Sequence, residues 1–196
     1  MSPTVEFFFD YGSPYSYLAD RRLLELRARS GVEVAYRPML LGGVFKATGN
    51  RSPAEEPVEA KRRYGGLALR RTAEAQGTPL RMNPHFPVNT LMLMRTAIAA
   101  QQEGVFERYH EVVYPAFWRE GLDLAKAEVL ADLLDAAGLD AAGLAELRGQ
   151  DPVKHALRLN TEEAVARGAF GAPTFFVGDE IFFGVDHFSL LERAFV

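Results

Sequence analysis

The chain has 196 residues, of which 48% are hydrophobic and 24% are charged, and its formal net charge is -4. This composition is that of an ordinary globular protein, and the acidic balance argues against a nucleic-acid partner, which usually needs a basic surface. Cysteine is absent, which excludes a disulfide framework, thiolate metal ligands and dithiol chemistry carried by the chain itself.

Membrane and targeting signals are also missing from the sequence. No apolar run approaches the roughly 18 residues of a membrane span, and "MSPTVEFFFD" lacks the pattern of a secretory signal. We therefore expect a cytoplasmic protein with no membrane partner. The four histidines show no metal-ligand spacing, so no metal site is expected.

The first 38 residues predict a strand, a helix and a second strand. "TVEFFFD" (4–10) is apolar at nearly every position, as in a strand buried on both faces. Apolar residues then recur at helical spacing from Pro14 until Gly31, a usual helix stop. "VEVAYRP" (32–38) alternates in the manner of a strand. Such a βαβ unit joins two parallel strands.

The middle of the chain predicts a helical block. A Gly- and Pro-rich stretch predicts a loop over about 40–57. Helical patterns follow over 58–76, 89–103, 105–117, 125–137 and 151–167. The first of them carries a cluster of arginines with one tyrosine, for which a solvated helix face is favoured over an anion site: Arg62, Arg63, Tyr64, Arg70 and Arg71.

The C-terminal segment returns to strands. "PTFFV" and "EIFF" are separated by a Gly-Asp pair, which predicts a two-residue hairpin. Gly184 ends the second strand, and Asp186 is expected to cap a last short helix. The predicted order is βαβ, a helical block and ββα, an α/β fold with helices on both faces of one sheet.

The first strand-to-helix turn, "FFFDYGSPYSYLAD" (7–20), is the first candidate site. Ser13 is placed as the helix N-cap and Pro14 as the first helical residue, so capping alone explains the serine. The same position directs free N–H groups and the positive end of the helix dipole outward, which suits an anion. From the residues alone, both interpretations remain open.

The second candidate site is "GAPTFF" (171–176). A proline at the entrance of a strand cannot donate a ladder hydrogen bond, so Pro173 must lie at a strand end or an edge. We predict that the Ala172–Pro173 bond is cis, which would turn the backbone N–H and C=O groups of Ala172 outward. His85, in "NPHFPVNT", is a further candidate pocket residue.

These features together resemble one family, the 2-hydroxychromene-2-carboxylate isomerases, which are related to kappa-class glutathione transferases. The resemblance is carried by "FDYGSPYSYLA", "RPMLLGGVFKATGN", "HFPVNT" and "AFGAPTFFVGDEIFFGVD", spread over nearly the whole chain. It implies a discontinuous thioredoxin-like βαβ–ββα domain (1–38 and 169–196) interrupted by a helical insertion (39–168). It also implies glutathione as cofactor and a homodimer.

The resemblance assigns roles to particular residues. Ser13 matches the serine that holds the glutathione sulfur, and Ala172, before Pro173, matches the residue whose backbone pairs with the tripeptide. Lys46 and Asn50 fall in the loop that closes over glutathione and the substrate, with Lys46 and His85 on the substrate side. The segment at the glutamyl end of glutathione is matched by Phe183, Gly184, Val185 and Asp186.

One residue departs from the family pattern: many relatives have arginine where this chain has His187, which removes the contact expected of that side chain. The implied reaction converts 2-hydroxychromene-2-carboxylate, a small aromatic substrate, to trans-o-hydroxybenzylidenepyruvate in the breakdown of naphthalene-like compounds. The alternatives are a kappa-type glutathione transferase or peroxidase, and a noncatalytic glutathione-binding module.

Overall fold

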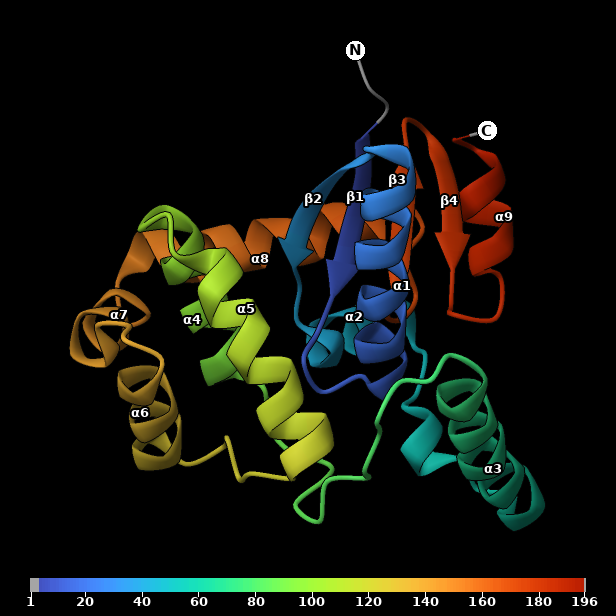
Figure 1. Ribbon diagram of the computed structural model, residues 1–196, viewed down its shortest axis with the longest axis horizontal. Coiled ribbons are helices and arrows are strands. Elements are labelled where there is room, and N and C mark those ends of the chain that lie inside the picture. The colour runs from blue at the N-terminus through green and yellow to red at the C-terminus, as the bar shows by residue number, and fades with distance from the viewer. Residues whose placement is uncertain (1–3, 196) are drawn as a thin grey trace.

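The computed structural model describes residues 4–195. Four strands form one sheet in the order β2-β1-β3-β4. β1 (Thr4–Phe9) pairs in parallel with β2 (Glu33–Pro38), and β3 (Thr174–Val177) pairs antiparallel with both β1 and β4 (Glu180–Phe183). The predicted βαβ and ββα units therefore lie side by side in one mixed sheet (Figure 1).

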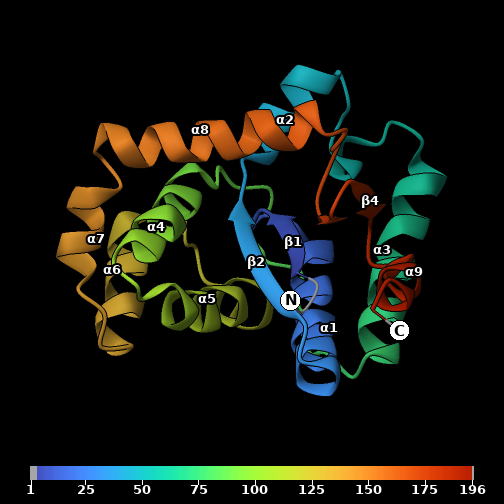
Figure 2. The same cartoon turned by 90° about the horizontal axis from the view of Figure 1, so that it is seen from above.

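The helices cover both faces of this sheet and extend beyond it (Figure 2). In chain order they are α1 (Pro14–Ser30), α2 (Leu41–Thr48), η1 (Pro53–Glu55), α3 (Glu59–Ala75), α4 (Leu91–Gln102), α5 (Phe106–Pro115), the π-helical turn η2 (Ala116–Glu120), α6 (Ala127–Ala136), α7 (Ala141–Leu147), α8 (Asp151–Ala166) and α9 (Phe188–Arg193). The predicted helical block is confirmed, with element ends within about two residues of expectation.

Side chains along a strand point alternately to the two faces of the sheet, and this divides the core into two layers. Phe7, Phe9 and Phe175 point to the face covered by α1 and join the large cluster that continues into α4 and α5. Phe8 and Phe176 point to the opposite face, where residues of α2 and α8 cover them. The three consecutive phenylalanines of β1 are explained by this burial on both faces. The division into domains at residues 38 and 169 stays a prediction.

Two local predictions were wrong, and one helix was missed. The predicted loop at 40–57 contains α2, whose first turn is held from outside: the Leu40 N–H donates to Thr161 Oγ1 at 3.0 Å and the Leu41 N–H to Asp10 Oδ2 at 2.9 Å. The short helix α7 was not predicted. Asp186 does not cap α9, because His187 occupies the N-cap position and no side chain there accepts a cap hydrogen bond.

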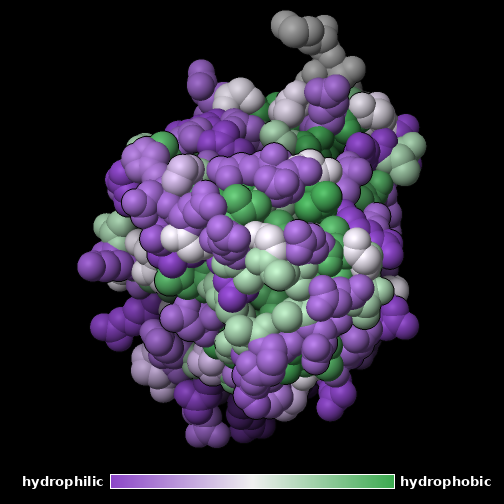
Figure 3. All heavy atoms as spheres, turned by 90° about the vertical axis from the view of Figure 1, so that its left-hand side faces the viewer, coloured by the Kyte–Doolittle hydropathy of each residue, from purple (hydrophilic) through white to green (hydrophobic). Residues whose placement is uncertain are grey.

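The outer surface of the helical block is mainly polar. Figure 3 shows this face, where hydrophilic residues surround smaller hydrophobic patches. Within residues 4–195, every helix is too short or too polar to cross a membrane.

Candidate active site

Ser13 lies at the carboxyl end of β1, where α1 begins. As predicted, it is the N-cap: its Oγ accepts a hydrogen bond from the Ser16 N–H at 3.1 Å, and Pro14 occupies the first helical position. The Ser13 N–H donates in turn to the Asp10 carbonyl at 2.9 Å. The side chain is nearly buried, with 4% of Ser13 exposed, so its hydroxyl is held in one place at the positive end of the helix dipole.

The two sequence motifs meet at this hydroxyl. The Ala172–Pro173 bond is cis, as predicted, and the Ser13 hydroxyl donates to the Ala172 carbonyl oxygen at 3.1 Å across 159 residues of sequence. Ser13 Oγ therefore accepts from its own helix and donates to the loop before β3. Both candidate sites are thus parts of one site.

A pocket of about 450 Å³ opens above Ser13. Four of the predicted residues line it: Ser13, Asn50, Ala172 and Phe183. The amide of Asn50 donates to the Phe170 carbonyl at 2.7 Å, which ties the segment after α2 to the loop before β3. Phe183 packs against Phe170 with tilted rings whose centroids lie 4.2 Å apart. The pocket walls are therefore braced against each other rather than formed by one loop.

The other predicted residues near the hairpin lie behind or beside the pocket. The Pro173 carbonyl accepts a hydrogen bond from the Gly184 N–H at 3.0 Å, and Val185 is buried in the main core. Asp186 is exposed, and its charge acts on Tyr15, which lines the pocket. The pKa of the Tyr15 hydroxyl lies above its ordinary value, mainly because the group is partly buried and to a smaller extent because of the negative charge of Asp186.

Two predicted substrate residues are not brought into the pocket. Lys46 lies on α2 and lines a different cavity. His85 is half-exposed, and its Nδ1 lies 3.7 Å from Asp123 Oδ2, although its neighbours Phe86 and Pro87 do line the Ser13 pocket.

Arginines give the pocket its charge. Arg51 and Arg62 line it, and among the described residues no carboxylate does. Arg62 belongs to the arginine cluster for which the sequence favours a solvated helix face, and its side chain also donates to the Glu56 carbonyl at 3.0 Å. With the N-terminus of α1 at its base, the pocket suits an anionic ligand.

Asp10 supports this site from below and was missed in the sequence. Its buried carboxylate accepts three hydrogen bonds, from the Gly12 N–H at 2.9 Å, the Leu41 N–H at 2.9 Å and the Thr90 hydroxyl at 3.0 Å. Desolvation by burial raises the pKa of this carboxyl, against the opposing effect of the three donors. The only sequence signal was an acidic residue ending a buried strand.

A second buried network holds the residue before Gly12. The Tyr11 hydroxyl lies 2.8 Å from His110 Nδ1, and His110 Nε2 lies 2.8 Å from Asp20 Oδ1. The Trp118 indole donates to the Tyr11 carbonyl at 2.7 Å. Tyr11 is therefore anchored to α1, α5 and η2, and the turn that carries Ser13 starts from a rigid base.

Known proteins share both the sequence pattern and this fold. A profile of the DSBA-like thioredoxin domain matches residues 4–196. A 2-hydroxychromene-2-carboxylate isomerase of Sphingobium xenophagum is 32% identical, covering 98% of this chain and 97% of its own. Glutathione S-transferase kappa 1 of Caenorhabditis elegans is 29% identical, covering 96% of this chain and 89% of its own.

A solved structure agrees with these relatives. That of a 2-hydroxychromene-2-carboxylate isomerase superposes with a TM-score of 0.87 at 30% identity, covering 97% of this chain and 93% of the other. The chain therefore belongs to the DSBA-like thioredoxin domain family and, within it, to the 2-hydroxychromene-2-carboxylate isomerase family of enzymes.

Proposed function

We propose that this enzyme is a glutathione-dependent cis–trans isomerase that converts 2-hydroxychromene-2-carboxylate to trans-o-hydroxybenzylidenepyruvate. The observation that carries the proposal is the position of the Ser13 hydroxyl, which lies at the N-terminus of α1, in a pocket with two arginines and 3.1 Å from the Ala172 carbonyl. The names of the isomerase relatives support the substrate. The kappa-class relatives support glutathione.

The residues of the pocket fit glutathione. Its volume of about 450 Å³ lies within the range of about 300–1,000 Å³ usual for small-molecule sites. Gly12 and Gly171 line it, and neither has space for a side chain: a Cβ would lie 2.9 Å from Thr90 Cγ2 at Gly12 and 3.1 Å from the Phe183 ring at Gly171. Arg51 and Arg62 can face the carboxylates of the tripeptide. The backbone of Ala172 can pair with a peptide.

The sequence contains no cysteine, so the thiol must come from the cofactor. Bound glutathione would supply a nucleophilic thiol whose reversible addition to a conjugated carbon lets the substrate rotate about a single bond. In this mechanism the Ser13 hydroxyl, which now donates to the Ala172 carbonyl, would donate to the sulfur and favour the thiolate. Arg51 and Arg62 hold the anionic ligand, and the walls around Phe45 and Phe86 exclude water.

The magnitude of the required pKa shift points to the hydroxyl as the main activating group. A thiol of pKa about 8.5 needs a shift of about 2 units, or about 2.7 kcal/mol, to be mostly thiolate at neutral pH. The helix dipole contributes about 0.3–1 kcal/mol at an exposed end. A hydrogen bond to a charged group contributes about 1.5–3 kcal/mol, so the Ser13 donor is the larger effect.

A kappa-type transferase or peroxidase is the second candidate, favoured by the kappa relatives at 27–29% identity. A noncatalytic glutathione-binding module is the third. We further expect a cytoplasmic homodimer active on small aromatic compounds, as the family resemblance implies.

One experiment separates the three functions. Turnover of 2-hydroxychromene-2-carboxylate is measured with and without glutathione and compared with conjugation of 1-chloro-2,4-dinitrobenzene. We expect isomerisation that requires glutathione and exceeds conjugation. Faster conjugation would favour the transferase, and glutathione binding without turnover of either compound would favour the binding module. Isomerisation that proceeds equally without glutathione would overturn the proposal.

A further inference from the structure

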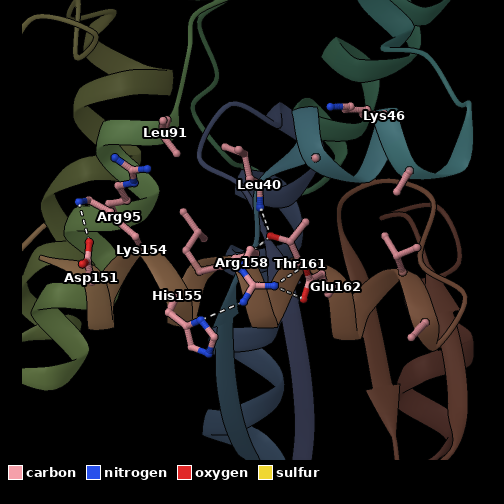
Figure 4. A pocket seen from close by; sticks show the side chains of 15 residues that line it. Leu40, Lys46, Leu91, Arg95, Asp151, Lys154, His155, Arg158, Thr161 and Glu162 are labelled. Carbon is pink, nitrogen blue, oxygen red and sulfur yellow. Dashed lines mark hydrogen bonds and ion pairs between the residues drawn. The ribbon is translucent and has the colours of Figure 1, made fainter. Parts of the chain in front are cut away.

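A second and larger cavity, of about 910 Å³, lies between α2, α4 and α8. Figure 4 looks into it. Apolar side chains from all three helices and the segment before α2 line most of it, namely Leu40, Ala47, Leu91, Leu157, Val165 and Ala166. Nothing in the proposed isomerase mechanism uses this cavity.

The helix α2 separates this cavity from the Ser13 pocket. Leu41 and Phe45, four residues apart on one side of α2, line the Ser13 pocket. Gly43, Lys46 and Ala47, on the other side, line the larger cavity. The helical period therefore explains why Lys46 lies away from Ser13.

Six charged side chains line the cavity, and four of them form pairs. Lys154 Nζ lies 3.0 Å from Asp151 Oδ1, and Arg158 Nη1 lies 2.7 Å from Glu162 Oε1. These two pairs leave no excess charge. The other lining residues carry no formal charge, so the two remaining cations set the net charge of the cavity.

Those two cations, Arg95 on α4 and Lys46 on α2, have no ion pair among residues 4–195. Arg95 Nε is buried and lacks a hydrogen-bond partner in the same part of the chain. In Figure 4 the two side chains lie on opposite sides of Leu40. The cavity thus has an excess of two positive charges in a chain whose formal net charge is -4.

We propose that this cavity is a second binding site, for a small amphipathic anion with an apolar body and one carboxylate or sulfonate group. The apolar lining favours the body, and its size is within the range of about 300–1,000 Å³ of small-molecule sites. The Arg95 guanidinium offers a planar fork that matches a carboxylate. A ligand without an acceptor group would leave the buried Nε of Arg95 without a partner, which is costly.

The test uses two fluorescent probes that differ by one anionic group. They are 8-anilinonaphthalene-1-sulfonate and the uncharged N-phenyl-1-naphthylamine, titrated into the full chain in the presence of saturating glutathione. Variants Arg95→Gln and Lys46→Gln each remove one positive charge from the cavity. The control Lys126→Gln removes the same charge from an exposed site that lines neither cavity.

We expect Arg95→Gln to weaken binding of the sulfonate probe at least fivefold and Lys46→Gln to weaken it at least twofold. Binding of the neutral probe should change less than twofold in both variants, and Lys126→Gln should change neither. Arg95→Lys keeps the positive charge and should recover part of the affinity. Far-ultraviolet circular dichroism checks that each variant folds. If Arg95→Gln does not fold, Lys46→Gln serves as the test variant.

Three results would overturn the proposal. The first is an equal loss of affinity for both probes in the Arg95→Gln and Lys46→Gln variants, which would indicate disturbed packing rather than a lost charge. The second is displacement of the sulfonate probe by glutathione, which would place it in the Ser13 pocket. The third is probe binding that occurs only when sedimentation velocity shows dissociation into monomers, because a second copy of the chain would then cover the cavity.

Discussion

The Asp10 carboxylate joins the turn that carries Ser13 to the start of α2, because Asp10 Oδ2 accepts the Leu41 N–H at 2.9 Å while Asp10 Oδ1 accepts the Gly12 N–H at 2.9 Å. The Thr90 hydroxyl, just before α4, donates to the same carboxylate at 3.0 Å. One buried side chain thus positions three segments, two of which form walls of the Ser13 pocket. We interpret Asp10 as a positioning residue.

The pH dependence of stability tests this role. Burial raises the pKa of Asp10 above its usual 3.8. A carboxyl whose pKa is higher in the folded chain stabilises the fold fully below its unfolded pKa, and this contribution is lost as pH rises through the folded pKa. The side-chain amide of the Asp10→Asn variant does not titrate. The free energy of unfolding of this variant, relative to the parent, should therefore rise from about pH 3.5 upward.

Urea unfolding at a series of pH values measures this difference. At the lowest pH the variant should be about 1–3 kcal/mol less stable than the parent, because an amide nitrogen cannot accept an N–H or O–H donor, whereas both oxygens of the protonated carboxyl keep a lone pair. A relative stability that stays flat or falls with rising pH would contradict the burial of a charged Asp10.

Ser13→Ala separates a cap from a thiolate donor. If Ser13 is only a cap, Ser13→Ala should lower the free energy of unfolding by about 0.5–2 kcal/mol and leave the folded protein fully active. As a donor to the sulfur, its loss should lower turnover by about tenfold to a hundredfold or more. The pH midpoint of the thiolate absorbance of bound glutathione, near about 240 nm, should then rise.

Two further variants serve as controls for Ser13→Ala. Ser13→Asp keeps a cap but places a negative charge beside the thiolate, so it should be more stable than Ser13→Ala and equally inactive. Ser16→Ala removes a buried hydroxyl that has no partner among residues 4–195, so it should leave the midpoint unchanged. An unmoved midpoint in Ser13→Ala would reduce Ser13 to a cap.

Arg62→Gln tests the charge of the pocket. Arg62 lines the pocket, whereas the adjacent Arg63 is exposed and does not. We expect Arg62→Gln to raise the KM for glutathione several-fold with little change in kcat, since a ground-state contact is lost. Arg63→Gln is the matched control, with the same change of net charge. Equal effects of the two variants would point to the overall charge of α3 instead.

Gly12→Ala tests the space beneath the Ser13 turn. A Cβ at Gly12 would lie 2.9 Å from Thr90 Cγ2, too close without movement. We expect lower stability and activity from Gly12→Ala because Thr90 must shift and weaken its hydrogen bond to Asp10. Adding Thr90→Ser removes the clashing methyl and keeps the hydroxyl, so the double variant should recover most of the loss. Thermal unfolding and turnover measure both, and absence of rescue would exclude this contact as the cause.

Local chemistry explains what could be predicted from the sequence. The Ser-Pro pair specifies the start of α1, because serine caps and proline tolerates the first helical position. The Gly-Asp pair specifies the two-residue hairpin between β3 and β4. The family resemblance, together with these motifs, indicated the fold and brought Ser13 and Ala172 together correctly as one site.

Only the tertiary structure decided which side chains share a pocket. Gly42 and Gly43 make residues 40–48 a poor helix by propensity, and α2 forms because Thr161 and Asp10 accept the N–H groups of Leu40 and Leu41 from distant segments.

Once α2 is helical, Phe45 and Lys46 point about 100° apart, and they enter different cavities. The residue types that favour a turn, a cap or a strand are local properties. Beyond their local contacts, Asp10 and Ser13 reach partners that lie 31, 80 and 159 residues away along the sequence, and only folding brings these together.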